Sequence, residues 1–129
     1  MNLLRLNYKS RPIDQTVVDF FSLSCHNLSV LHLFDVKDIH MDDLRLTIGL
    51  CKLLDSLLLN DCSIREDWDH IRTFDRRKPL SETVRCLQLL NFQILPSQTV
   101  TFLNLFKGLQ VGAAFIFVLI CVLFLIHNS

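Results

Sequence analysis

The sequence predicts an α/β fold, a short curved solenoid of strand-and-helix repeats that is followed by a single C-terminal transmembrane helix. Two observations predict it. First, "CHNLSVLHLFDV" at 25–36 and "CKLLDSLLLNDC" at 51–62 match at an offset of 26 residues, with cysteines and leucines in the same places. Second, residues 109–126 read "LQVGAAFIFVLICVLFLI", a long segment that contains no charged side chain.

The repeated segment predicts a short strand in each copy. Leu31 and Leu33 alternate with other residues in the first copy, as Leu57 and Leu59 do in the second. Every second side chain of a strand points to the same side, so these leucines would face one interior. A single copy cannot bury such a face alone, whereas stacked copies bury a continuous ladder of leucines.

Two further copies are incomplete or differently spaced. "VRCLQLLNFQI" places Leu87 and Leu89 in the same pattern, although it stands 30 residues after the second copy. "LLRLNYK" near the start supplies only the strand of Leu4 and Leu6. The sequence therefore predicts about three and a half units, which is near the minimum for a stable stack of repeats.

Between the strands, mostly apolar residues recur with helical spacing. They are Ile13, Val17, Phe20, Phe21 and Ser24 in the first connection, Met41, Leu44, Ile48 and Cys51 in the second, and Trp68, Ile71 and Phe74 in the third. Asp42 is a candidate N-cap of the second helix, and Gly49 fits its end.

The offset and the pattern L-x-x-L-x-L-x-x-N/C-x-L are those of leucine-rich repeats. The segment from Cys51 to Ile64 reads C-x-x-L-x-x-L-x-L-x-x-C-x-I and resembles the cysteine-containing leucine-rich repeats of F-box substrate receptors, although no F-box is visible. The resemblance implies a curved solenoid whose concave strand face holds a protein substrate for ubiquitin ligation. Repeats of NLR-type receptors have a similar pattern.

The segment 109–126 is expected to span a membrane. Its helix would be about 27 Å long, close to the thickness of a thin hydrocarbon core. It is apolar around its circumference, whereas a buried C-terminal helix, the alternative, normally keeps a polar stripe. Lys107 precedes it and no Lys or Arg follows it. Because the segment reaches almost to Ser129, the protein is expected to be single-pass and tail-anchored. The positive-inside rule places the N-terminal part in the cytosol, and the lack of Lys or Arg after Ile126 favours the endoplasmic reticulum.

The expected organisation has four parts, of which the repeats are the largest. They are repeats at 1–95 with a partial first unit, an amphipathic linker at 96–108, the transmembrane helix at 109–126 and a tail at 127–129. The membrane lipid bilayer would be a partner through 109–126. The formal net charge of zero and the lack of a large basic patch argue against a nucleic acid partner.

No catalytic motif is visible, so we expect neither an enzyme nor a cofactor, and no catalytic, cofactor-binding or metal site. Two of the three glycines lie beside or inside the apolar segment 109–126, which leaves little for a phosphate-binding loop. "REDWDH" clusters Glu66, Asp67, Asp69 and His70. A metal site is one reading of that cluster, and a solvated helical face around Trp68 and Ile71 is the favoured one.

The outward positions of the expected strands form the candidate binding site. They are Val30, His32 and Phe34 in the first full copy, Ser56, Leu58 and Asn60 in the second, and Cys86, Gln88 and Leu90 in the third. Exposed phenylalanine and leucine side chains favour a partner that covers them. We assign partner binding to these positions except Cys86.

The expected function is a non-enzymatic, membrane-tethered interaction module or adaptor for a cytosolic protein, with a possible relation to ubiquitin-ligase substrate recognition. The alternatives are a truncated or spliced product of a longer repeat protein and a non-catalytic subunit of a membrane complex. In the first of these, apolar outward residues would reflect missing neighbouring repeats rather than binding.

Overall fold

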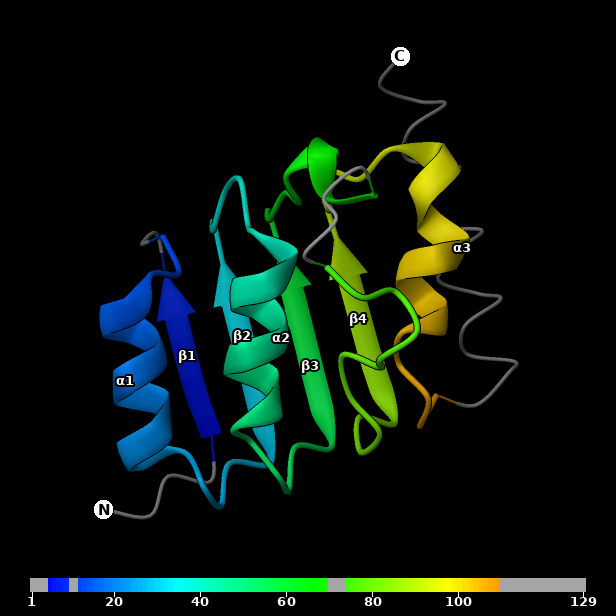
Figure 1. The fold of residues 1–129 in the computed structure, drawn as a ribbon. Coiled ribbons are helices and arrows are strands. Elements are labelled where there is room, and N and C mark those ends of the chain that lie inside the picture. Colours follow the sequence, from blue (N-terminus) through cyan, green and yellow to red (C-terminus); the bar gives the residue numbers. More distant parts are fainter. Residues whose placement is uncertain (1–4, 10–11, 70–73, 110–129) are drawn as a thin grey trace.

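In the computed structural model, which describes residues 5–9, 12–69 and 74–109, the described strands form one parallel sheet in the order β1-β2-β3-β4 (Figure 1). The elements in chain order are β1 (Arg5–Lys9), α1 (Gln15–Ser24), β2 (Val30–Phe34), α2 (Met41–Gly49), β3 (Ser56–Asn60), the 3₁₀ helix η1 (Glu66–Asp69), β4 (Cys86–Leu90) and α3 (Pro96–Asn104).

The strands pair without any shift in register. Leu31 lies opposite Leu57, and Leu57 lies opposite Leu87. Consecutive parallel strands need a crossover connection, and α1 and α2 lie on the same side of the sheet, as Figure 1 shows. The inward side chains of the strands therefore face a layer of helices.

The core lies between the sheet and this helical layer. Leu31, Leu57 and Leu87 are fully buried there, in one cluster with residues from α1, α2 and α3. Asp14 caps α1, because its side chain accepts a hydrogen bond from the backbone N–H of Val17 at 3.1 Å. The residue before α2 is His40, so the prediction that Asp42 caps this helix is wrong.

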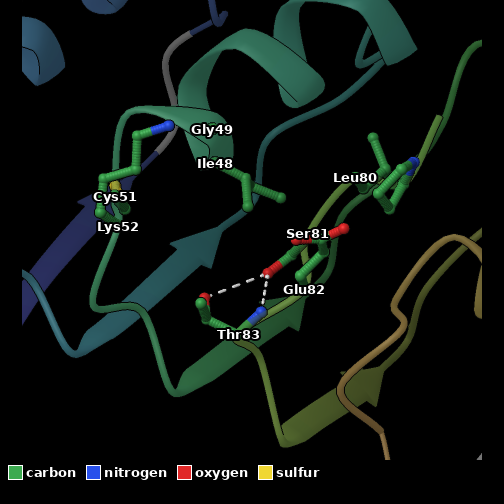
Figure 2. A pocket seen from close by; sticks show the side chains of 9 residues that line it. Ile48, Gly49, Cys51, Lys52, Leu80, Ser81, Glu82 and Thr83 are labelled. Carbon is green, nitrogen blue, oxygen red and sulfur yellow. Dashed lines mark hydrogen bonds between the residues drawn. The ribbon is translucent and has the colours of Figure 1, made fainter.

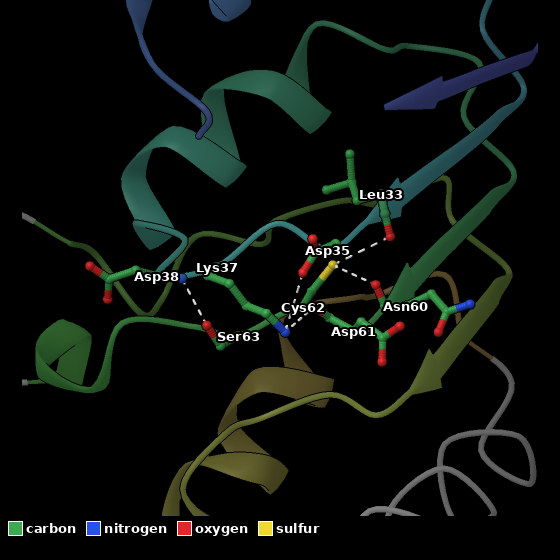
Figure 3. A network of polar contacts seen from close by, with 8 residues as sticks. All are labelled: Leu33, Asp35, Lys37, Asp38, Asn60, Asp61, Cys62 and Ser63. Atoms are coloured by element: carbon green, nitrogen blue, oxygen red, sulfur yellow. Dashed lines mark hydrogen bonds and ion pairs between the residues drawn. The ribbon is translucent and has the colours of Figure 1, made fainter. Parts of the chain in front are cut away.

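The chain turns sharply after three strands, each time at an Asp or Asn with a left-handed backbone. Asp35, Asp61 and Asn91 have φ angles of 52°, 55° and 48°. Asp and Asn tolerate this conformation better than most residues. Beyond the turn, the thiol of Cys62 donates to the carbonyl oxygens of Leu33 and Asn60, each at 3.3 Å (Figure 3). The repeated cysteine position thus satisfies carbonyl groups at the ends of β2 and β3.

The third connection is less regular than the first two. In its described part, η1 is a short 3₁₀ helix of 4 residues, so the helix expected around Trp68 is not present there. Trp68 is buried, and its indole N–H donates to Oε1 of Gln98 at 2.8 Å, while Nε2 of Gln98 donates to the carbonyl of Glu66 at 2.7 Å. A tertiary contact with α3 replaces the helical packing that the apolar spacing predicts.

The stretch 96–108, expected to be a linker, contains α3 and packs on the core. Pro96 stands in the first turn of α3, where a missing backbone N–H costs nothing. Phe102 is fully buried, and the backbone N–H of Leu80 donates to the carbonyl of Leu105 at 2.8 Å. Gly108 lies very close to the backbone of residues 82–84. A Cβ atom at this position would be 2.8 Å from the backbone oxygens of Glu82 and Val84.

The predicted fold class is wrong. The structure is a small α/β domain with a 4-stranded parallel sheet and three α-helices in its described part, and it does not show a curved leucine-rich-repeat solenoid followed by a transmembrane helix. The connections differ in content, since the described part of the third one contains the 3₁₀ helix η1 where the repeat predicts an α-helix like those of the first two.

The predicted membrane location is also contradicted. Within the ranges 5–9, 12–69 and 74–109, no helix is long and apolar enough to cross a membrane. The longest, α1, has 10 residues, which is about half of the length that a span requires. This finding overturns the single-pass, tail-anchored assignment and the preference for the endoplasmic reticulum. Except for Leu109, the predicted span at 109–126 and its contact with a bilayer lie outside the described residues.

Candidate functional site

The outward side chains of the sheet form a continuous surface, which we call the strand face. Its members are Arg5, Asn7 and Lys9 on β1, Val30, His32 and Phe34 on β2, Ser56, Leu58 and Asn60 on β3, and Cys86, Gln88 and Leu90 on β4. These side chains are half-buried or exposed, whereas their inward neighbours Leu31, Leu57 and Leu87 are fully buried. No described helix packs on the strand face.

The strand register arranges this surface in rows across the sheet. The middle row is Asn7, His32, Leu58 and Gln88, and the next row is Lys9, Phe34, Asn60 and Leu90. Directly opposite side chains on one face of neighbouring strands lie close enough to make contact. All eight residues that the sequence assigned to partner binding therefore lie together on one surface.

A shallow hollow of about 60 Å³ opens on the strand face between β3 and β4. We call it the face hollow, and its lining is His32, Leu58, Leu59, Asn60, Gln88 and Leu90. Leu90 keeps 47% of its surface exposed. The hollow thus has an apolar floor with an imidazole and two side-chain amides around it.

His32 and Phe34 form an aromatic pair beside the face hollow. Their ring centroids are 3.6 Å apart, with an angle of 34° between the ring planes. Partial burial lowers the pKa of His32 below its ordinary value, and the positive charge of Arg5 lowers it further. The neutral imidazole is therefore favoured, so this pair presents an uncharged aromatic surface at neutral pH.

The β1 end of the strand face is basic. Arg5 and Lys9 are both exposed there, and no ion pair holds either of them to another described residue. The strand face carries no carboxylate in any of its rows. Exposed acidic residues flank the strands instead: Asp35 and Asp61 follow β2 and β3 in the left-handed turns, and Asp55 directly precedes β3.

The turns at the strand ends are occupied by their own contacts. The ammonium group of Lys37 donates to the carbonyl of Asp61 and lies 3.8 Å from the carboxylate of Asp35 (Figure 3). The hydroxyl of Ser63 accepts from the backbone N–H of Asp38 at 2.7 Å. These contacts tie the polar groups to the turns.

A second hollow, of about 170 Å³, lies between the end of α2 and the loop at 79–83 (Figure 2). Ser81 and Thr83 supply its hydroxyl groups. The Ser81 hydroxyl accepts from the backbone N–H groups of Thr83 and Val84, each at 3.1 Å. These bonds make Ser81 part of its own turn.

No group of three or more His, Cys, Asp or Glu side chains that could hold a metal occurs in the described part of the chain. In the "REDWDH" segment, Asp67 forms an ion pair with Arg65 at 3.3 Å, and Glu66 is exposed. His70 lies outside the described residues. The part of this acidic cluster that can be described is a solvated surface around the buried Trp68.

The described cysteines divide between the two sides of the domain. Cys25, Cys51 and Cys62 are free thiols in the interior, and Cys86 is exposed on the strand face. Burial raises the pKa of Cys51 to about 12, with a further contribution from Cys25, and it raises the pKa of Cys62 as well. The three interior thiols therefore act as small apolar side chains.

The sequence missed the β1 side of this surface. "LLRLNYK" indicated a strand through Leu6, but an incomplete copy did not suggest outward positions, so Arg5, Asn7 and Lys9 were not assigned. The signal was available in the two-residue period of the strand. Comparison of the chain with protein-family models, curated proteins and solved structures finds no match.

Proposed function

We propose that this domain is a non-enzymatic protein-interaction module that binds its partner on the strand face. The observation that carries the proposal is the face hollow, where Leu58 and Leu90 remain accessible beside the His32–Phe34 pair. Accessible apolar and aromatic side chains with few charges at the centre are typical of binding surfaces. The amides of Asn60 and Gln88 add hydrogen-bonding groups around this apolar centre.

The helical side of the domain offers a natural comparison. Leu46 on α2 exposes 53% of its surface, and Val100 on α3 exposes 59%. Single exposed apolar residues of this kind are ordinary on protein surfaces. On the strand face, by contrast, the register places Phe34, Leu58 and Leu90 on adjacent strands beside one hollow. The shared hollow favours the strand face more than exposure does, because Phe20 and Leu23, one turn apart on α1, are exposed as well.

The resemblance to cysteine-containing leucine-rich repeats remains part of this proposal. The equivalent cysteine positions are interior, and the leucines at an offset of 26 residues lie opposite one another in the sheet. Both features are compatible with repeats of that kind. A role as an adaptor for a protein substrate follows from the resemblance and rests on it alone.

Site-specific crosslinking tests the proposal. A photoreactive amino acid is placed at Gln88 on the strand face in one variant and at Val100 on the helical side in a second. We expect a discrete crosslinked partner from Gln88 and none from Val100. Leu90→Asp is then added to the Gln88 variant, with Leu46→Asp as a control of similar exposure.

We expect Leu90→Asp to abolish the crosslink, because a charge in the hollow is left without a partner, and Leu46→Asp to leave it unchanged. Thermal unfolding of both variants shows whether each remains folded. Equal loss of the crosslink in both variants contradicts binding on the strand face. Crosslinks to chaperones alone support the alternative of an incomplete repeat protein.

A further inference from the structure

The charges and the shape of the strand face also define the kind of partner that fits it. We propose that the strand face binds an extended acidic peptide segment, with a carboxylate at Lys9 and an aliphatic side chain in the face hollow. This inference rests on the proposed function and adds the chemistry of the partner. The partner is a segment of another protein, and it lies across the strands.

Charge complementarity is the first argument. Arg5 and Lys9 are the charged side chains of the strand face, and both are positive. The chain as a whole has a formal net charge of zero, so the acidic side chains that balance Arg5 and Lys9 lie outside the strand face. A partner with carboxylates would meet attraction on this surface and no repulsion from its rows. Two cations are too few for a nucleic acid, whose binding depends on many phosphate contacts.

Unused hydrogen-bonding groups are the second argument. Asn7, Asn60 and Gln88 carry amide groups on the strand face, and these side chains form no hydrogen bond within the described part of the chain. Each amide can donate and accept at once, as the backbone of an extended peptide requires. The backbone groups of β2 and β3 are already paired inside the sheet. Recognition therefore comes from side chains, with the peptide lying across the strands.

The row that contains Lys9 sets the spacing of the peptide. Lys9, Phe34, Asn60 and Leu90 stand in register on neighbouring strands. Neighbouring strands are about 4.8 Å apart, so the hollow between β3 and β4 lies roughly 12 Å from β1. An extended peptide advances about 3.3 Å per residue and turns every second side chain to the same side. An acidic residue and an aliphatic residue four positions apart span about 13 Å and face the sheet together.

The size of the face hollow suits a small aliphatic side chain. Its volume is about 60 Å³, which is room for about four water-sized groups. The side chains of Leu58 and Leu90 supply apolar contacts in it, whereas the side chain of Leu59 is buried in the core on the other side of the sheet. Between this hollow and Lys9, the His32–Phe34 pair lies under the middle of the peptide. The structure thus assigns a separate chemical requirement to each end of the segment.

Selection from a displayed library of random 12-residue peptides tests the inference on the intact chain. We expect enrichment of peptides in which Asp or Glu stands four positions from Leu, Ile, Val or Met. A synthetic enriched peptide is then titrated by fluorescence polarisation against Lys9→Glu and Leu90→Asp. The matched controls are Lys52→Glu, outside the strand face, and Leu46→Asp on α2.

We expect each strand-face variant to weaken binding at least about tenfold, and the two controls to bind like the wild type. Added salt should weaken binding of the wild type and have less effect on Lys9→Glu. Neutral or basic peptides whose binding is lost in Leu90→Asp but kept in Lys9→Glu overturn the inference and leave the proposed function standing. Lack of enrichment overturns the inference for linear peptides, while the crosslink from Gln88 still tests the proposed function independently.

Discussion

The two sides of the same four strands have opposite properties. On the inward side, Leu31, Leu57 and Leu87 form an unbroken ladder with no exposed surface. On the outward side, the neighbouring residues His32, Leu58 and Gln88 form a row that remains accessible. A shift of one residue exchanges the two sides, because side chains alternate along a strand.

The difference separates stability from recognition within one sheet. A substitution on the inward side opens a cavity in packed surroundings, whereas a substitution on the outward side changes what solvent or a partner meets. The chain offers pairs of the same residue type, one in the interior and one on the strand face. These pairs allow the comparison to be tested with little change in chemistry.

The largest expected difference is between two thiols, Cys51 in the interior and Cys86 on the strand face. A pKa of about 12 for Cys51, against an ordinary value of 9.0, lowers its thiolate fraction near pH 8 by about a thousandfold. Burial also blocks access to it. Alkylation followed by peptide mass spectrometry should therefore label Cys86 long before Cys51, and similar rates would contradict the assignment of the two sides.

The second expected difference is between Leu57 and Leu58. Leu57 is fully buried, so Leu57→Ala should lower the free energy of unfolding by about 3 kcal/mol, within a range of about 2 to 5. Leu58→Ala should cost about 1 kcal/mol or less, because Leu58 lines an open hollow. Urea unfolding of the two variants measures both values. Equal losses would mean that the outward side is also part of the core.

The third difference concerns two glutamines. Gln98 is 2% exposed and joins Trp68 to the backbone of Glu66 through two hydrogen bonds. Gln98→Ala should lower the free energy of unfolding by about 1 to 3 kcal/mol, since the buried indole N–H of Trp68 and the part-buried carbonyl of Glu66 each lose a hydrogen bond. Gln88→Ala, on the strand face, should change it by no more than about 0.5 kcal/mol. Chemical denaturation can compare the two directly, and a reversed order would refute this description of the third connection.

The smallest expected effect is the titration of His32. Its pKa is lowered in the folded protein, first by burial and then by Arg5, so the folded state binds fewer protons than the unfolded state in mild acid. The neutral imidazole contributes its full share to the free energy of unfolding above about pH 6.5, the ordinary pKa of histidine. This contribution is lost as the pH falls through the lower pKa that His32 has in the folded protein. His32→Gln should reduce this slope in unfolding measured from pH 7.5 to 5.5. An unchanged slope would place the titration elsewhere.

The strands could be predicted closely from the sequence. Leucines at alternate positions and an offset of 26 placed Leu31 and Leu57 opposite one another, as the structure has them. The outward positions followed from the same period. Such alternation is a local property of each strand, so it can be recognised in a single sequence.

Other parts depend on tertiary contacts and were predicted poorly. The spacing of Trp68 and Phe74 suggested a helix, but their side chains meet in an edge-to-face contact with centroids 5.6 Å apart, and Trp68 bonds to Gln98 instead. The guanidinium of Arg45 also lies over the ring of Phe74, 4.0 Å from the ring centroid. Residues far apart in sequence make these contacts, so the local pattern could not reveal them. Pro96 was a usable signal for α3, since proline is favoured in the first turn of a helix.

The fold class and the membrane location were inferred from general rules, and both inferences were wrong. Uniform repeats imply a solenoid only where the connections are equivalent, and here a short 3₁₀ helix interrupts them. The span was predicted at 109–126 from the length, the apolar circumference and the flanking charge of that segment, whereas no helix in the described residues is long and apolar enough to cross a membrane.

Crosslinking from Gln88, repeated in Leu57→Ala and in Leu90→Asp, tests the central claim most directly. Each variant is assayed at a temperature where circular dichroism shows it to be folded. We predict that Leu57→Ala, although much less stable, keeps the crosslinked partner, and that Leu90→Asp, although nearly as stable as the wild type, loses it. Loss of the partner in the folded Leu57→Ala variant together with its retention in Leu90→Asp would contradict the division of the sheet into a stabilising side and a binding side.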